Sequence, residues 1–184
     1  MSQPLVDYEV VDDIGVITLN RPDKMNAMSA SLLDELEHRF SIAKTDPRGS
    51  VVLLQGAGPS FCAGYDLAPD DWILSQYGAD FDGPVDAVVD REDVTEILER
   101  WLRLWKFPKP IVAKVQGVCL AGAGELLGVA DLVVAATDAR FGQPAGRDLG
   151  IPVTLSCWPM IIGMRKTKEL LFTSKLSDGP DAER

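Results

Sequence analysis

Residues 111–135 have the sequence IVAKVQGVCLAGAGELLGVADLVVA, in which two apolar runs flank a glycine-rich segment. The runs Ile111 to Gln116 and Asp131 to Ala135 have the length and the β-branched content of strands. Between them, Gly122 to Ala130 has the composition of a short helix entered through glycines. A strand, a helix and a strand in this order predict a βαβ unit, and therefore an α/β fold with helices on the faces of a parallel sheet.

The N-terminal half extends this pattern. Val6 to Val11 and Gly15 to Leu19 are β-branched runs joined by the turn-forming pair Asp12-Asp13, so they predict a β-hairpin. A helix is expected from Ser29, which can cap its first turn, to Lys44. Val51 to Gln55 is a short apolar run that suits another buried strand.

The C-terminal half is less regular. Ala68 to Asp93 is acidic and rich in turn residues, which predicts a long irregular surface segment. Apolar residues at helical spacing then run from Val94 to Trp105, and this helix must end before Pro108. The remaining expectations are an irregular connection over Phe141 to Pro152, helices over Leu155 to Gly163 and Lys166 to Phe172, and a polar, turn-like tail over Ser177 to Arg184.

The composition is that of a globular protein. The 184 residues are 46% hydrophobic and 25% charged, which excludes disordered and fibrous classes. With 18 Lys and Arg against 28 Asp and Glu, the formal net charge is −10. A field of this sign repels nucleic-acid backbones and anionic bilayers, so we expect neither partner, although a few placed N–H groups can still bind an anionic small molecule. No segment has the pattern of a signal peptide or a transmembrane helix.

Cysteine and histidine usage narrows the chemistry. The three cysteines, Cys62, Cys119 and Cys157, are widely spaced, so we expect no disulfide framework and no zinc site, and a reducing, cytoplasmic location fits. Cys62 is interpreted as a packed thiol rather than a nucleophile. His38, the only histidine, lies among charged residues of a predicted helix and is interpreted as a solvated side chain. A Ser-His-Asp mechanism is therefore excluded.

Two glycine-rich segments each follow a predicted buried strand: GAGPSFCAGYDL at 56–67 and GVCLAGAGELL at 117–127. Glycine lets the backbone turn sharply and approach a ligand, and N–H groups at the start of a helix point outward as donors. Two such loops side by side can place two N–H donors on one oxygen atom, which is an oxyanion hole. Neither segment has the GxGxxG or GK[ST] pattern of nucleotide-binding loops.

Several segments, in this order, resemble the enoyl-CoA hydratase/isomerase or crotonase superfamily over nearly the whole chain. They are NRPDKMNA (20–27), FCAGYDL (61–67), PKPIVAKVQG (108–117), LAGAGE (120–125), ADLVVA (130–135) and FGQP (141–144). The resemblance implies a crotonase-like core of stacked β-β-α units, with residues 1–184 as a single domain. It also implies that the ligand is an acyl-CoA thioester, bound as substrate, whose enolate is stabilised without a metal or other cofactor.

The resemblance assigns roles to individual residues. The backbone N–H groups of Tyr65 and Gly122 match the two oxyanion-hole positions, and Glu125 matches the first of two catalytic glutamates. The residues that match the loops touching coenzyme A, mostly through main chain, are Met25, Ala27, Ala63, Asp66 and Leu67. Glu125 stands among apolar neighbours, and a partly desolvated carboxylate suits a general acid or base. The alternative is a helix-terminal glutamate that only complements the helix dipole.

The chain departs from the hydratase pattern at Ala145, where hydratases of this family have the second glutamate, because alanine cannot transfer a proton. Asp148 is the nearest carboxylate, and it is either a replacement catalytic group or a solvated loop residue. Arg147 is a candidate for balancing an anionic group. We expect a hydratase-like enzyme of fatty acid metabolism. The alternatives are isomerase, C–C lyase or thioester hydrolase chemistry, or a non-catalytic acyl-CoA-binding subunit.

The resemblance also bears on assembly. Family members continue into a helical C-terminal region that supports homotrimers, often paired into hexamers, and this chain ends near where that region begins. If residues 1–184 are the entire protein, we expect exposed apolar surface on the last helices; where the region is present, we expect a trimer or hexamer. Trp101 and Trp105 are expected in the core, whereas Trp72 and Tyr77 are candidates for lining the acyl pocket.

Overall fold

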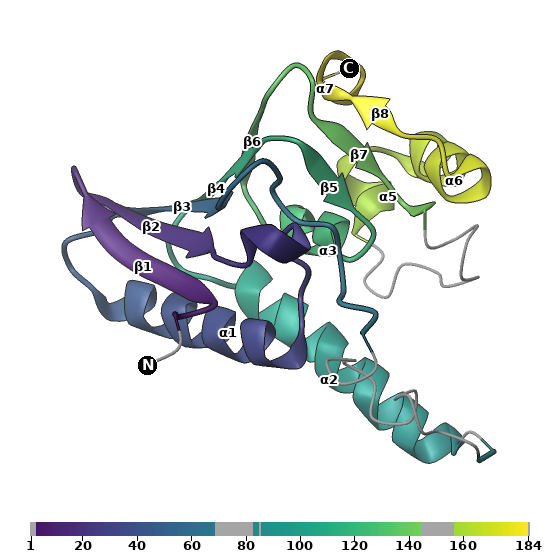
Figure 1. Cartoon of the computed structure of the whole chain (residues 1–184), viewed down its shortest axis with the longest axis horizontal. Coiled ribbons are helices and arrows are strands. Elements are labelled where there is room, and N and C mark those ends of the chain that lie inside the picture. The colour runs from purple at the N-terminus through teal and green to yellow at the C-terminus, as the bar shows by residue number, and fades with distance from the viewer. Residues whose placement is uncertain (1–2, 69–82, 85, 145–156, 184) are drawn as a thin grey trace.

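The computed structural model describes residues 3–68, 83–84, 86–144 and 157–183 (Figure 1). Strands β1 (Val6–Val11) and β2 (Ile14–Leu19) form the predicted antiparallel hairpin. Asp12 and Asp13 join them with φ values of 49° and 63°. This left-handed conformation at both positions lets a two-residue turn follow the twist of the strands.

The main sheet has five strands in the order β1-β2-β3-β4-β6. From β2 onward they run parallel, as the strand–helix–strand pattern predicts; the added strands are β3 (Val51–Gly56), β4 (Ile111–Val115) and β6 (Leu132–Ala135). Helix α1 (Ala30–Thr45) packs on β1 and β2 and confirms the helix expected there. Its N-cap is Ser29, whose side chain accepts a hydrogen bond from the Leu32 N–H.

A second, three-stranded sheet stacks beside the first, in the order β5-β7-β8. Its members are β5 (Val118–Leu120), β7 (Arg140–Gly142) and β8 (Ser177–Asp178). Strand β4 belongs to the main sheet and β5 to the second, and β6 and β7 divide in the same way, so the stacked β-β-α arrangement is confirmed. Helix α3 (Ala123–Gly128) follows β5 and completes one such unit.

Strands β5 and β7 were not expected, and the segment from Phe141 was predicted to be irregular. Each strand has only three residues, too few to show a period of two. They are strands because they pair with each other in parallel, with Val118 opposite Arg140 and Leu120 opposite Gly142. The polar tail was likewise predicted as turn-like, but Ser177 pairs with Phe141 of β7, and the short helix α7 (Gly179–Ala182) follows.

Helix α2 (Ala87–Trp105) begins within the segment up to Asp93 that is predicted to be irregular. Asp86 caps it by accepting a hydrogen bond from the Val88 N–H at 2.8 Å. The buried residues of α2 all lie in its second half. Its first turns are therefore helical without the apolar period on which the prediction depended.

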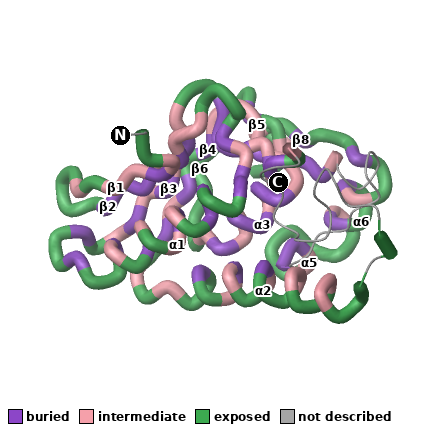
Figure 2. The backbone as a smooth tube through the Cα atoms, turned by 60° about the horizontal axis from the view of Figure 1, so that its bottom comes forward, coloured by how far each residue is buried: buried purple, intermediate pink, exposed green. Residues whose placement is uncertain are grey.

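The hydrophobic core is made of buried residues of the main sheet and of helices α1 and α2, and it continues into α3 and the C-terminal helices; Figure 2 colours the buried positions purple. Trp101 of α2 is fully buried in it, as predicted, but Trp105 is 44% exposed, which corrects the second half of that prediction. The two residues lie four positions apart in α2, and only Trp101 belongs to the core. Of the helices that the structure describes, none has both the length and the apolar character needed to cross a membrane.

Beyond the second sheet lie α5 (Trp158–Ile161) and α6 (Met164–Thr173). These two helices expose the side chains of Met160, Ile161, Met164 and Phe172, of which Phe172 is 80% exposed. All four residues of the edge strand β6 are exposed as well. The assignment of residues 1–184 to a single domain stays a prediction.

Candidate active site

The first glycine-rich loop lies between two other segments that the sequence analysis singled out. On one side, the Ala63 N–H donates a hydrogen bond to the Met25 carbonyl at 2.9 Å. On the other side, the Cys62 N–H donates to the Val118 carbonyl of β5 at 3.0 Å. These main-chain bonds bring together the segments around residues 25–28, 61–66 and 116–120, which are far apart in the sequence.

Asn26 holds the first loop in shape. Its side chain is fully buried, and its Nδ2 donates hydrogen bonds to three carbonyl oxygens, those of Ala57, Ser60 and Phe61, at 2.9, 2.9 and 3.1 Å. Its Oδ1 accepts a hydrogen bond from the Arg21 N–H at 2.9 Å. One amide side chain therefore satisfies four main-chain groups. Asn26 belongs to the motif NRPDKMNA (20–27), but the motif by itself does not predict this role.

An ion pair closes the same loop. Arg21 Nη1 lies 2.9 Å from Asp66 Oδ2, and these side chains are 13% and 10% exposed. Desolvation by burial raises the pKa of Asp66, but hydrogen bonds from the Ala68 N–H and from Arg21 outweigh it, together with the charges of Arg21 and Lys24. The pKa of Asp66 consequently lies below its ordinary value. At neutral pH this carboxylate is therefore ionised and paired with Arg21.

The two glycine-rich loops approach each other at Gly64 and Gly122. Gly64 has a φ of 102°, and a Cβ there would lie 2.8 Å from the Leu120 carbonyl and 3.2 Å from the Gly122 nitrogen. A Cβ at Gly122 would lie 2.5 Å from the Cε2 of the Tyr65 ring. Both positions require glycine, because a side chain on either would separate the loops.

The backbone N–H groups of Tyr65 and Gly122 are the predicted oxyanion-hole donors. The Gly122 N–H donates to no acceptor among the described residues. The Met28 N–H donates a hydrogen bond to the Gly64 carbonyl, and the Asp66 N–H donates one to the Met28 carbonyl. Since N–H groups alternate in direction along an extended segment, the Tyr65 N–H points away from Met28.

Glu125 lies in the first turn of α3 and is 1% exposed, which confirms the expected desolvation. The Tyr65 hydroxyl donates a hydrogen bond to its Oε2 at 2.8 Å, and the Trp101 Nε1 of α2 donates to that same hydroxyl at 3.0 Å. On the α5 side, burial raises the pKa of the Cys157 thiol, and the charge of Glu125 raises it further. The carboxylate is thus enclosed by three separate segments.

Sequence reasoning missed the side chains of Tyr65 and Trp101. It used only the backbone N–H of Tyr65, and it treated Trp101 as apolar filling. One signal was available, because a buried indole N–H needs an acceptor. Nothing in the local pattern identified that acceptor, which lies 36 residues away in the chain.

The other predicted site residues differ in how far their side chains are exposed and whether they are paired. Met25 and Leu67 are 50% and 53% exposed, whereas Ala27 and Ala63 are half-buried and the Asp66 side chain is paired with Arg21. The positions that lie outside the described residues are Trp72, Tyr77, Ala145, Arg147 and Asp148.

The cysteines fit the interpretation that they are packed thiols. All three are buried, and the Cys62 thiol donates a hydrogen bond to the Asn26 carbonyl at 3.1 Å. Burial raises the pKa of Cys62 to about 12, against the smaller opposing effect of the Gly64 N–H. A thiol with this pKa is almost entirely protonated near neutral pH and is a poor nucleophile.

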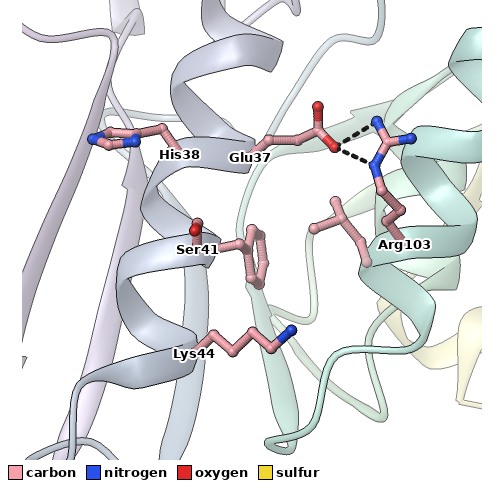
Figure 3. Close-up of a pocket in the computed structure, with 7 residues that line it drawn as sticks. Glu37, His38, Ser41, Lys44 and Arg103 are labelled. Atoms are coloured by element: carbon pink, nitrogen blue, oxygen red, sulfur yellow. Dashed lines mark hydrogen bonds and ion pairs between the residues drawn. The ribbon is translucent and has the colours of Figure 1, made fainter.

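A groove of about 460 Å³ lies elsewhere, between α1 and α2. It contains His38, which is exposed as predicted, and an ion pair in which Arg103 Nη2 lies 2.8 Å from Glu37 Oε1 (Figure 3). None of the predicted site residues lines it. In the part of the chain that the structure describes, no group of three or more His, Cys, Asp or Glu side chains could hold a metal ion.

Known proteins resemble the chain along most of its length. The family model described as Enoyl-CoA hydratase/isomerase matches residues 9–184. EchA13 of Mycobacterium tuberculosis, which bears an enoyl-CoA hydratase name, is 35% identical over 183 residues that cover 91% of this chain and 57% of EchA13. A Rhizobium meliloti protein with a similar name is 30% identical over 193 residues, covering 100% of this chain and 67% of the relative.

A solved structure shows the same fold. The crystal structure of an enoyl-CoA hydratase from Mycobacterium smegmatis has 36% sequence identity and a TM-score of 0.85 with this chain. The similarity covers 97% of this chain and 62% of that one. The chain therefore spans between 57% and 67% of the length of these three proteins.

Proposed function

Because the chain belongs to the enoyl-CoA hydratase/isomerase family, whose model matches residues 9–184, we propose that it transforms an acyl-CoA thioester through an enolate. The observation that carries the proposal is the buried Glu125 carboxylate, three residues after Gly122 in the loop that faces Gly64 and Tyr65. A carboxylate shielded from water, beside N–H donors, suits proton transfer next to a developing oxyanion.

In the proposed reaction, the N–H groups of Tyr65 and Gly122 bind the thioester oxygen and Glu125 moves a proton. When water adds to a 2-enoyl thioester, its oxygen bonds to the β carbon and Glu125 takes one of its protons. The electron pair of the carbon–carbon double bond moves toward the thioester oxygen, which gives the enolate. Glu125 then passes the proton to the α carbon. Each N–H donor stabilises the transition state by about 3 kcal/mol.

The coenzyme A part of the substrate is proposed to lie along the main chain of Met25, Ala27, Ala63, Asp66 and Leu67. The exposure of Met25 and Leu67 supports this placement. The Asp66 side chain is paired with Arg21, so its contribution to coenzyme A binding is through the main chain. No metal and no redox cofactor takes part in the proposed chemistry.

A second set of reactions is favoured by one feature of the sequence. With Ala145 in place of the second glutamate, one carboxylate remains at the family's two acid/base positions. Isomerisation, C–C cleavage and thioester hydrolysis through the same enolate are the alternatives, together with a subunit that binds acyl-CoA without turnover. Asp148 as a replacement for the second glutamate is part of the hydratase proposal.

Calorimetric titration with crotonyl-CoA, run in parallel with the absorbance of the conjugated thioester, tests the proposal. Binding with loss of absorbance that disappears in Glu125→Gln is the expected result. Binding without loss of absorbance contradicts hydration and leaves another acyl-CoA reaction or a binding subunit. Absence of binding contradicts the whole proposal.

Ala145→Glu separates hydration from the alternatives. If the absence of the second glutamate limits the rate of hydration, the folded variant should hydrate crotonyl-CoA at least about 10-fold faster than the wild type. A folded variant with no gain favours the alternative reactions. Asp148→Asn is the companion variant, and a loss of hydration in it identifies Asp148 as the replacement carboxylate.

Assembly, pathway and location complete the proposal. A homotrimer, or a hexamer made of two trimers, is proposed for a chain that carries the family's C-terminal helical region, and sedimentation velocity measures it. Fatty acid metabolism in the cytoplasm is the proposed setting, which the three buried cysteine thiols support.

A further inference from the structure

Three side chains from three separate segments form a hydrogen-bonded chain that ends on Glu125. The Trp101 Nε1 of α2 lies 3.0 Å from the Tyr65 hydroxyl oxygen, and that oxygen lies 2.8 Å from Glu125 Oε2. Trp101 is fully buried and Glu125 is 1% exposed, so both ends of this chain lie in the interior. The family roles given above use only the backbone of Tyr65 and do not include Trp101.

The direction of each hydrogen bond follows from which of the three side chains has a proton to donate. An indole N–H can only donate, so the Tyr65 oxygen accepts from Trp101. The phenol has a single proton, which then points at Glu125 Oε2. Glu125 Oε2 is therefore the acceptor of the Tyr65 hydrogen bond, and each bond polarises the next.

We propose that Tyr65, oriented by Trp101, is a positioning residue that holds Glu125 as a hydrogen-bond-accepting carboxylate, so that Glu125 enters the reaction as the base. This inference rests on the proposed function. Hydrogen bonds donated to a charged group are among the stronger ones in proteins, and here the accepting Glu125 side chain is buried. The phenol thus contacts the carboxylate of a chain in which Ala145 replaces the family's second glutamate.

The Tyr65 ring has a second role that any test must separate from the first. It packs over Gly122, where an added Cβ would lie 2.5 Å from the ring. Tyr65→Phe keeps that packing and removes only the hydroxyl. Tyr8→Phe is the matched control. Tyr8 lies on β1, away from the site, and its hydroxyl also donates a hydrogen bond to a carboxylate, Asp46 Oδ2, at 3.2 Å.

The experiment measures kcat and KM for crotonyl-CoA in four proteins: wild type, Tyr65→Phe, Trp101→Phe and Tyr8→Phe. Tyr65→Phe is expected to lower kcat by about 10-fold to 100-fold with KM little changed, since the lost bond acts on the base and not on binding. Trp101→Phe should lower kcat in the same way but less, and Tyr8→Phe should leave it unchanged. Circular dichroism and thermal unfolding verify that each variant is folded.

A double-mutant cycle shows whether Tyr65 acts through Glu125. In a Glu125→Gln background, Tyr65→Phe should cause no further loss of the remaining rate, because the group that it positions is gone. A kcat at the wild-type level in Tyr65→Phe, equal losses in Tyr65→Phe and Tyr8→Phe, or an additive loss in the double variant overturns the proposal.

The indole N–H signal distinguishes failure of this inference from failure of the proposed function. In ¹⁵N-labelled protein, Trp101→Phe assigns the Trp101 indole resonance, and Tyr65→Phe should shift it and accelerate its exchange with deuterated solvent. An inactive wild type in which this shift occurs overturns the proposed function, and with it the role of Glu125 as base, while it confirms the hydrogen-bonded chain. An active wild type with an unchanged Trp101 resonance overturns the positioning role alone.

Discussion

The two glycine-rich loops of the site both follow strands, yet they are built differently. The loop at 56–67 is held by side chains from outside it, because Asn26 bonds to three of its carbonyls and Arg21 pairs with Asp66. The loop at 117–127 is held mainly by main-chain bonds, and its one charged side chain, Glu125, points inward and is buried. The polar groups of the first loop stabilise its shape, whereas the buried carboxyl group of the second is suited to proton transfer.

The largest expected effect is that of Glu125→Gln in the second loop. Removal of the proton carrier should lower kcat for the preferred acyl-CoA by about 10²-fold to 10⁴-fold. The free energy of unfolding should change little, because glutamine has the same shape and keeps an oxygen that can accept from the Tyr65 hydroxyl. Steady-state kinetics and urea unfolding measure the two quantities. Wild-type kcat, or a marked loss of stability, contradicts the contrast between the loops.

Asn26→Ala should have the largest effect on stability in the first loop. It leaves three carbonyl oxygens without their amide donor, so the free energy of unfolding should fall by about 3 kcal/mol. Asn20→Ala is the control, since the Asn20 amide bonds to Asp7 in a half-buried position and should cost less than about 1 kcal/mol. Urea unfolding of both variants measures the difference, and equal losses contradict the role given to Asn26.

Gly64→Ala tests how closely the two loops approach. Its Cβ would meet the Leu120 carbonyl at 2.8 Å in a backbone with φ of 102°, so a loss of about 2 kcal/mol is expected. Gly163→Ala is the matched control, because Gly163 also has a positive φ, 78°, but no atom within 4 Å of an added Cβ. That variant should lose about 1 kcal/mol from backbone strain alone. If the two thermal unfolding shifts are the same, the close approach contributes nothing.

Asp66→Asn should have the smallest effect, and the effect should depend on pH. The folded-state pKa of Asp66 lies below the ordinary 3.8, so its ion pair stabilises the fold above that value and is lost as pH falls through the folded-state pKa. The variant should lose about 1 kcal/mol at pH 7, and the difference from the wild type should shrink below pH 3.8. Asp34→Asn is the control, because the Asp34 side chain is 71% exposed and its pair with Arg100 contributes little. A difference that does not change with pH contradicts the assignment.

Most of the regular structure could be predicted from local patterns. The Asp12-Asp13 turn, the Ser29 cap and the alternation of apolar runs with glycines each act over a few residues, and each is where it was expected. Strands β5 and β7 and the first turns of α2 were not predicted, because they depend on pairing with each other or on a cap rather than on an apolar period. The family resemblance placed Glu125, and its burial follows from the apolar neighbours that surround it in the sequence.

By itself, the sequence determined the parallel sheet, the two glycine-rich loops after its strands, and the place of Glu125 in the second of them. Only the tertiary structure decided that Asn26 spans the first loop and that Trp101, Tyr65 and Glu125 form one hydrogen-bonded chain. The Tyr65 and Glu125 side chains are 60 residues apart in the sequence. Sequence periodicity reports which face of an element is buried, but the packing of whole elements sets which polar atoms meet there, and that packing depends on the entire core.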